Sequence, residues 1–385
     1  MVLLKESILH EIRKNSGFDL YPINYAVASP RISGMTKHGL VASPSQREGE
    51  LEIENLDESL MSIAGFDLRV GDEIYLSHNQ RAKIPTIHHL QELAKNGELK
   101  RLEPDKNGKF TLEHDINGNK IYYIATYERL RLSQRLDLRI DAKSTIGRLG
   151  VMCDNKADMS SHTMFTQPII FTAQPYAFDL HVTPGKSSLI QAILRNKSSP
   201  FMTHEQILNG QRVVSFSEKG REALLEEIIR EDGLQMTYDT SAAIAAKKVP
   251  PCPIDVDAPK RYYKGEDFYK LVKCGQEVSL NPKTLYLMRT IQRINLRNAC
   301  GILSREAKHT GTGLWGHFAG FIWPGFEGPI TMECRSESRR IISHGDPAAF
   351  LQLDNLPREL SSQEAYSGSY QKVNPLTPKM FTPLE

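Results

Sequence analysis

The stretch IYYIATYERLRL, Ile121–Leu132, decides how this chain is expected to fold, because a second copy of it follows. The copy is LYLMRTIQRINL, Leu285–Leu296, in which a tyrosine, a threonine, an arginine and the last leucine match 164 residues later. QPI at Gln167–Ile169 corresponds in the same order to GPI at Gly328–Ile330, 161 residues later. A nearly constant offset in a chain of this size predicts a duplicated domain.

Charged and aliphatic residues alternate from 129 to 140. The charged positions are Arg129, Arg131, Arg135, Asp137 and Arg139, and the aliphatic ones are Leu130, Leu132, Leu136, Leu138 and Ile140. A period of two predicts a strand with one apolar face. Asn107-Gly108 and Asn117-Gly118 predict tight turns between short strands. We therefore predict a mainly β protein with a few short helices, in which each copy is a small barrel or sandwich.

The pattern changes between the two copies. Ser217 stands at an N-cap position, and a helical spacing of apolar residues follows up to Asp232-Gly233. The sequence thus predicts a helical connection at 198–235, between a first domain at 1–197 and a second at 236–385. Two further short helices are predicted, one near the start of the chain (Leu4, Ile8, Leu9 and Ile12) and one from Thr86 to Asn96.

Composition narrows the class of protein. The 385 residues include 48 basic and 46 acidic side chains, a net charge of +2, which gives no bulk field for nucleic acid. The five cysteines include no CxxC pair, which argues against a disulfide framework and a structural zinc site. Apolar runs are too short for a signal peptide or a membrane span. We expect a protein of the reducing cytoplasm with no nucleic-acid or membrane partner.

The stretch AKSTIGRLG, Ala142–Gly150, carries a lysine, two hydroxyls, an arginine and two glycines. Hydroxyls and a guanidinium suit polyphosphate oxygens, and glycine lets the backbone approach a ligand closely. Spacing alone favours a basic surface turn over a phosphate-binding segment. The neighbouring motifs decide between these interpretations.

Four segments resemble the dCTP deaminase branch of the dUTPase superfamily. KSTIGRLG at Lys143–Gly150 resembles its central motif, and GFDLRVG at Gly65–Gly71 resembles the segment that enters its distorted β-barrel. AGFIWPGFEGPITME at Ala319–Glu333 resembles the stretch with the catalytic glutamate, and YSGSYQ at Tyr366–Gln371 resembles the tail that closes over nucleotide. The resemblance implies two tandem dUTPase-like distorted β-barrel (β-clip) domains, of the long, duplicated type.

The resemblance also implies a reaction, the zinc-free hydrolysis of dCTP to dUTP and ammonia, with Mg²⁺ held through the triphosphate and no metal held by the protein. Glu333 would be the general base that activates water against C4 of cytosine, with Ser144 and Arg148 as the other catalytic residues. Apolar neighbours would raise the pKa of Glu333 toward neutrality. Family members form threefold assemblies, so a homo-oligomer with threefold or pseudo-threefold arrangement is expected. The residues expected to bind nucleotide are Lys143, Ser144, Thr145, Arg148, Gln352, Tyr370 and Gln371.

Zinc-dependent cytidine deaminases have a different signature, an H-x-E segment followed by P-C-x-x-C. Pro251-Cys252 is followed by Asp255 where the second cysteine should fall, and no histidine matches the first half of the signature. The sequence therefore favours a reaction without zinc.

Two residues depart from the family pattern. Thr172 falls where the second copy has Glu333, so we expect a composite site in which Ser144 and Arg148 face Glu333 from the other copy or from a neighbouring chain. Trp323 stands where the superfamily usually has an aspartate that activates water against the α-phosphate. Two alternatives remain open, a dUTP or dCTP diphosphatase (including a bifunctional deaminase-diphosphatase) and a catalytically degenerate nucleotide-binding protein.

Overall fold

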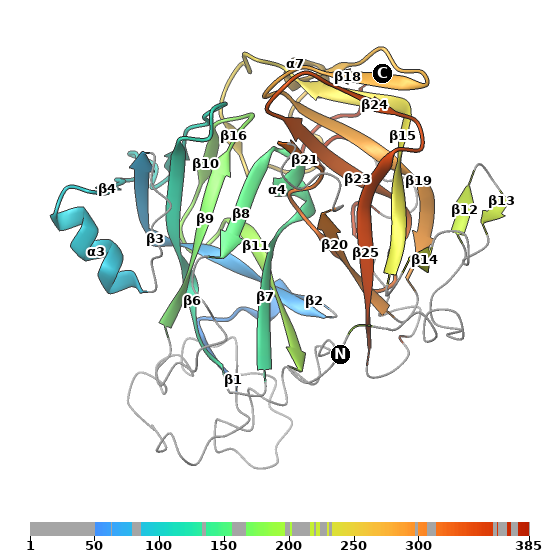
Figure 1. Cartoon of the computed structure of the whole chain (residues 1–385). Helices are drawn as coiled ribbons and strands as arrows, with labels where there is room; N and C mark the ends of the chain where they lie inside the picture. Colours follow the sequence, from blue (N-terminus) through green and yellow to red (C-terminus); the bar gives the residue numbers. More distant parts are fainter. Residues whose placement is uncertain are drawn as a thin grey trace.

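The computed structural model describes residues 51–62, 64–78, 86–132, 136–155, 167–196, 201, 216–218, 221–223, 229–230, 233–296, 299–305, 313–356, 360, 368–370 and 376–384. Within these residues two β-rich halves lie side by side, the first blue to green and the second yellow to red (Figure 1). Each half is built around one large sheet, of nine strands in the first and eleven in the second. The predicted mainly β fold with two tandem domains is confirmed.

The large sheet of the first half runs in the order β7-β11-β3-β6-β9-β8, with antiparallel pairing between the neighbours. Side chains that alternate along its strands pack into the first apolar core, and the opposite face buries a smaller cluster that includes Tyr75, Tyr123 and Ile170. The elements of this half are β1 (Leu51–Glu54), η3 (Glu58–Leu60), β2 (Met61–Ser62), β3 (Gly65–His78), α3 (Ile87–Lys95), β4 (Lys100–Arg101), β5 (Phe110–Leu112), β6 (Lys120–Leu132), β7 (Leu136–Ala142), α4 (Ser144–Arg148), β8 (Val151–Asn155), β9 (Gln167–Pro175), β10 (Leu180–Val182) and β11 (Ser188–Asn196).

The second half repeats this plan, since its strands β15, β19 and β23 pair in the same antiparallel order as β3, β6 and β9. A separate apolar core lies within it. Its elements after the connection are β15 (Gly233–Ala246), β16 (Ile254–Asp255), α7 (Gly265–Phe268), β17 (Tyr269–Leu271), β18 (Glu277–Leu280), β19 (Leu285–Asn295), β20 (Ala299–Arg305), β21 (Leu314–Trp315), β22 (Phe321–Ile322), β23 (Glu327–Ser336), β24 (Arg340–Ser343) and β25 (Pro347–Asn355).

The duplication extends to individual hydrogen bonds. The hydroxyl of Thr126 accepts from the N–H of Ile169 at 2.9 Å, and that of Thr290 accepts from the N–H of Ile330 at 3.0 Å. β6 shifts register against β9, and β19 shifts register against β23, at the same place in the repeat. The irregularity in the pairing is thus repeated as well. The offset read from the sequence therefore corresponds to two copies of one structure.

The helical connection predicted at 198–235 is wrong where the structure describes it. Ser217, predicted to be an N-cap, instead lies in a strand that pairs with Arg293 of β19. Pairing with β19 outweighs the local helical spacing, because tertiary contacts override weak local preferences. β15 also begins at Gly233, three residues before the predicted start of the second domain. The described strands of the connection are β12 (Phe216–Glu218), β13 (Arg221–Ala223) and β14 (Ile229–Arg230).

The helix predicted from Thr86 to Asn96 is confirmed as α3. Thr86 is its N-cap, and the threonine hydroxyl accepts from the N–H of His89 at 3.2 Å. The helix predicted near the start of the chain, at 4–12, lies outside the described residues. No helix in the described part of the chain is long and apolar enough to cross a membrane.

Parts of the second half complete the core of the first half. β16 pairs with β10 in parallel, and the aromatic residues Phe268 and Tyr269 pack into the first core. The last described residues also pack there, since Met380 and Phe381 are buried. The two halves are thus held together by shared apolar packing as well as by the chain between them.

Candidate active site

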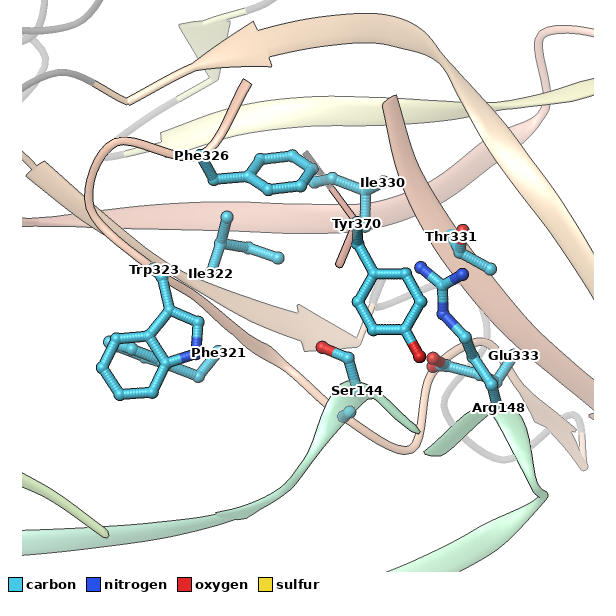
Figure 2. A pocket seen from close by; sticks show the side chains of 11 residues that line it. Ser144, Arg148, Phe321, Ile322, Trp323, Phe326, Ile330, Thr331, Glu333 and Tyr370 are labelled. Carbon is cyan, nitrogen blue, oxygen red and sulfur yellow. The ribbon is translucent and has the colours of Figure 1, made fainter. Parts of the chain in front are cut away.

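A small pocket lies where α4 of the first half meets β22 and β23 of the second. Figure 2 shows Ser144, Arg148 and Glu333 in its wall, opposite a group of apolar side chains. The structure thus places the three residues of the composite-site hypothesis around one pocket, within a single chain. The lining residues are Ser144, Arg148, Ala319, Phe321, Ile322, Trp323, Phe326, Ile330, Thr331, Glu333 and Tyr370.

Gly147 allows the two halves to approach each other here. A Cβ at this position would lie 2.9 Å from the Cβ of Ala319 and 3.0 Å from its nitrogen. Glycine at 147 therefore fits a space that a larger residue would have to push open. β7 leads directly into α4. Between them the N–H of Lys143 donates a hydrogen bond to the carbonyl of Leu189 on β11, before the chain turns.

Glu333 is a buried carboxyl group in β23, with 2% of its surface exposed. Its Oε2 accepts a hydrogen bond from the backbone N–H of Phe318 at 3.0 Å. Burial raises the pKa of Glu333 to about 7, although the N–H of Phe318 and the charge of Arg148 lower it in part. A group with this pKa can both take and give a proton near neutral pH, which is what a general acid–base catalyst requires.

A second carboxyl group, that of Asp141 near the end of β7, forms a hydrogen bond between the first half and the second. Its Oδ2 accepts from the N–H of Gly320 at 3.0 Å. Burial raises the pKa of Asp141 to about 6, and its charge in turn raises the pKa of Glu333. Sequence reasoning missed this residue. Its position directly before the motif at 142–150, in an alternating strand, was the available signal.

Both the side chain and the backbone of Arg148 contact tyrosine residues that hold it in place. Its guanidinium carbon lies 3.8 Å from the centre of the Tyr370 ring, and its backbone carbonyl accepts from the hydroxyl of Tyr269 at 2.9 Å. The hydroxyl of Tyr370 is bonded to Thr145 Oγ1 at 2.9 Å and accepts from the N–H of Lys379 at 3.0 Å. Tyr370, from the C-terminal tail, therefore stands in the pocket beside Arg148 (Figure 2).

The other residues predicted to bind nucleotide are not among the described residues that line the pocket. Lys143 forms an ion pair with Asp67 and does not line the pocket, and Thr145 is buried behind Tyr370. Gln352 lies in β25, opposite Ile302 of β20, and is not among the lining residues. Gln371 lies outside the described residues.

The two departures from the family pattern have different surroundings. Thr172 is buried in β9, where its hydroxyl donates to the carbonyl of Asp154 at 3.3 Å. Trp323 lines the pocket and packs edge-on against Phe321, with ring centres 4.9 Å apart. The place of the usual aspartate is thus part of an aromatic wall that offers at most an N–H donor.

The described residues that line the pocket include few side chains of the kinds that bind metal ions. In the described ranges no group of three or more His, Cys, Asp or Glu side chains is arranged to hold a metal ion. Of the described residues that line the pocket, Glu333 is the one with a carboxylate.

Comparison with known proteins points to one family. The sequence profile of the dCTP deaminase-like family matches twice, at residues 42–195 and 205–351, which together make up most of the chain. No curated protein matches the sequence. Among solved structures, the 2′-deoxycytidine 5′-triphosphate deaminase from Agrobacterium tumefaciens is similar, with a TM-score of 0.66 and 19% sequence identity over 86% of this chain and 98% of that one. This likeness supports the fold, and the double match of the profile supports the family. The chain therefore belongs to the dCTP deaminase-like family.

Proposed function

We propose that this protein hydrolyses dCTP to dUTP and ammonia, and that Glu333 is the general base. The observation that carries the proposal is a buried carboxyl group with a pKa of about 7, placed in one pocket with Ser144 and Arg148. Membership of the dCTP deaminase-like family supports the same reaction.

The proposed chemistry uses one carboxylate twice. Glu333 removes a proton from water as the water oxygen bonds to C4 of cytosine, and it passes this proton to N3. Glu333 then takes the proton of the C4 hydroxyl and passes it to the amino group at C4, so that the C4–N bond breaks, ammonia leaves and the carbonyl of uracil forms. Such proton transfers contribute about 10²–10⁴-fold to the rate. The apolar wall that includes Phe321 and Phe326 supports this role, since it keeps the pKa of the carboxyl group high.

The triphosphate is proposed to lie between α4 and the C-terminal tail. Burial lowers the pKa of Lys379, and the nearby charge of Lys143 lowers it further, while Asp67 raises it in part. Lys379 and Arg148 both contact Tyr370, so three cationic side chains gather on this side. Cations held this close together suit a polyanion. Magnesium would enter bound to the phosphate oxygens, and its role would be to neutralise their charge. Ser144, which opens α4 and lines the pocket, would position the nucleotide or the attacking water.

The test is to incubate the purified protein with dCTP and Mg²⁺ and to separate the products. We expect dUTP and an equal amount of ammonia, with turnover lost in Glu333→Gln. Release of pyrophosphate with dCMP or dUMP would instead support a diphosphatase or a bifunctional enzyme. Calorimetric binding of dCTP without any turnover would support the catalytically degenerate alternative and refute the deaminase.

A further inference from the structure

A second pocket lies in the second half of the chain, between β15, β19 and the turn that follows β24. We call it the arginine pocket, and its charged or ionisable lining residues include Asp239, Arg289, Arg293 and His344. No described residue lines both this pocket and the pocket of Glu333. The two are neighbours, because Arg289 pairs across the β19–β23 ladder with Thr331, which lines the pocket of Glu333.

Arg289 is half-buried in the wall of the arginine pocket. Its Nε is buried and has no hydrogen-bond partner among the described residues. Burial lowers the pKa of Arg289, and the charges of Arg148 and Arg293 lower it further, while Asp239 raises it in part. A guanidinium group stays protonated in proteins even so. The fold therefore holds a positive charge close to two others, and such a charge is normally compensated by an anion.

The duplication provides an internal comparison for Arg289. With the offset of 164 residues, Arg289 of β19 corresponds to Ala125 of β6. Ala125 occupies the same place in the strand pairing, opposite Ile170 of β9, and is buried. The first copy thus forms the same ladder with a methyl group at this position. Strand pairing alone does not require an arginine there.

A second comparison concerns Arg293, which corresponds to Arg129 in the first copy. Arg129 lies opposite Glu54 of β1, and its Nε is 3.3 Å from Oε2 of that glutamate. In the second copy the equivalent position on β12 is Ser217, which lies opposite Arg293. The position that carries a carboxylate in the first copy is therefore uncharged in the second. An anion in the arginine pocket would restore negative charge beside the arginine.

One carboxylate, that of Asp239, also lines the arginine pocket. Its Oδ1 accepts from the N–H of Ser241 at 2.9 Å and lies 3.7 Å from Nδ1 of His344. The two guanidinium groups of the wall exceed this single carboxylate in charge. The electrostatic balance of the pocket is thus positive, which favours an anion over a cation as its ligand.

We propose that the arginine pocket binds a phosphate group, held by the guanidinium groups of Arg289 and Arg293. A guanidinium presents a fork of N–H donors that matches the oxygens of phosphate. The buried Nε of Arg289 would donate to one of these oxygens and so gain the acceptor that it lacks in the described structure. The phosphate is either free inorganic phosphate or part of a nucleotide. This site is separate from the one proposed for dCTP and does not depend on deamination.

The experiment measures binding of inorganic phosphate to the full-length protein by calorimetry, in phosphate-free buffer at constant sodium chloride. Arg289→Met and Arg293→Met each remove one guanidinium and keep a long side chain. Arg129→Met is the matched control, since it makes the same change at the corresponding position of the first copy. Lys379→Met reports on phosphate that binds beside the pocket of Glu333. Circular dichroism verifies that each variant is folded.

We expect saturable binding that Arg289→Met weakens by about 10- to 100-fold and the more exposed Arg293→Met by about 2- to 10-fold. Arg129→Met and Lys379→Met should leave this binding unchanged. Because Arg293 is an exposed side chain, its variant keeps the test decisive if Arg289→Met fails to fold. If phosphate does not bind, or if Arg293→Met and a folded Arg289→Met both retain the full affinity, the inference is overturned. Binding that only Lys379→Met removes belongs to the pocket of Glu333 and also overturns it.

A second titration identifies the source of the phosphate group. The nucleotide dUMP is titrated into the same variants under the same conditions. Tighter binding of dUMP than of inorganic phosphate, lost in Arg289→Met, identifies a nucleotide as the ligand of the arginine pocket. An Arg289-dependent affinity for inorganic phosphate that dUMP does not exceed identifies free phosphate. Both results are independent of whether the protein deaminates dCTP, because neither titration requires turnover.

Discussion

Gly147 faces Glu333 so closely that a Cβ added to the glycine would lie 3.2 Å from Oε1 of the glutamate. The glycine belongs to the first copy of the repeat and the glutamate to the second, so the pocket depends on a tight contact between the two halves. The same Cβ would come within 2.9 Å of Ala319. A methyl group at 147 can be accommodated only if one half moves away from the other.

Gly147→Ala is therefore expected to lower both stability and activity. Overpacking of this kind typically costs about 1–3 kcal/mol of unfolding free energy. A displacement of the base relative to the substrate should lower kcat/KM for dCTP by about 10- to 100-fold. Gly275→Ala is the control, because a Cβ there would meet nothing within 4 Å. Equal urea midpoints and equal kcat/KM for the two variants would show that the contact at 147 is not needed.

The raised pKa of Glu333 predicts the pH dependence of the reaction. A general base must be ionised, so kcat/KM for dCTP should rise with pH through an apparent pKa near 7. Asp141→Asn removes the negative charge that raises the pKa of Glu333 and keeps an oxygen that can accept from Gly320. The acid limb of the profile should therefore move to lower pH in this variant. An unmoved limb, measured in excess Mg²⁺, would mean that another group controls the profile.

The sequence predicted much of the fold because the repeat and the alternation in its strands are local patterns that the structure preserves. Helix α3 was predictable for the same reason, since Thr86 supplies a cap and the apolar spacing is regular. The connection near Ser217 was predicted wrongly, because its strand forms by pairing with Arg293, more than seventy residues away in the chain. Local spacing does not report such a partner.

The candidate site was predictable in part for a similar reason. Ser144, Arg148 and Glu333 belong to motifs that can be identified in the sequence, and their convergence followed from the duplication. Asp141 and Thr331 lie close to these motifs but have their significance only in three dimensions. Asp141 contacts the opposite half, and the Thr331 hydroxyl is buried in the pocket wall with no hydrogen-bond partner among the described residues. Burial and pairing of this kind depend on the packed structure and not on spacing.

Glu333 should also make the stability of the protein depend on pH. Its pKa is raised from 4.5 to about 7 by burial, so the folded state binds the proton more tightly than the unfolded state. The stability that this proton provides is fully present below about pH 4.5 and is lost as the pH rises through about 7. At about 1.4 kcal/mol per pKa unit, the loss is about 3 kcal/mol.

Glu333→Gln replaces the carboxyl group by a neutral amide and should remove this dependence. Relative to the unchanged protein, the variant should gain about 3 kcal/mol of unfolding free energy between about pH 4.5 and about pH 8. Urea unfolding at a series of pH values measures the difference. A difference that stays constant over this range would show that the carboxyl group has an ordinary pKa in the folded protein.

The placement of Arg148 and Glu333 in one chain predicts the outcome of a mixing experiment. Arg148→Ala and Glu333→Gln should each abolish dCTP turnover, because each damages the same pocket. If the pocket forms within each chain, every chain in a mixture still carries one defect, even after the two variants are unfolded and refolded together. The mixture should therefore be as inactive as its components, in an assay that detects about 1% of the unchanged rate. Recovered activity in the mixture would mean that a complete site is assembled from two chains, and the single-chain site would have to be abandoned.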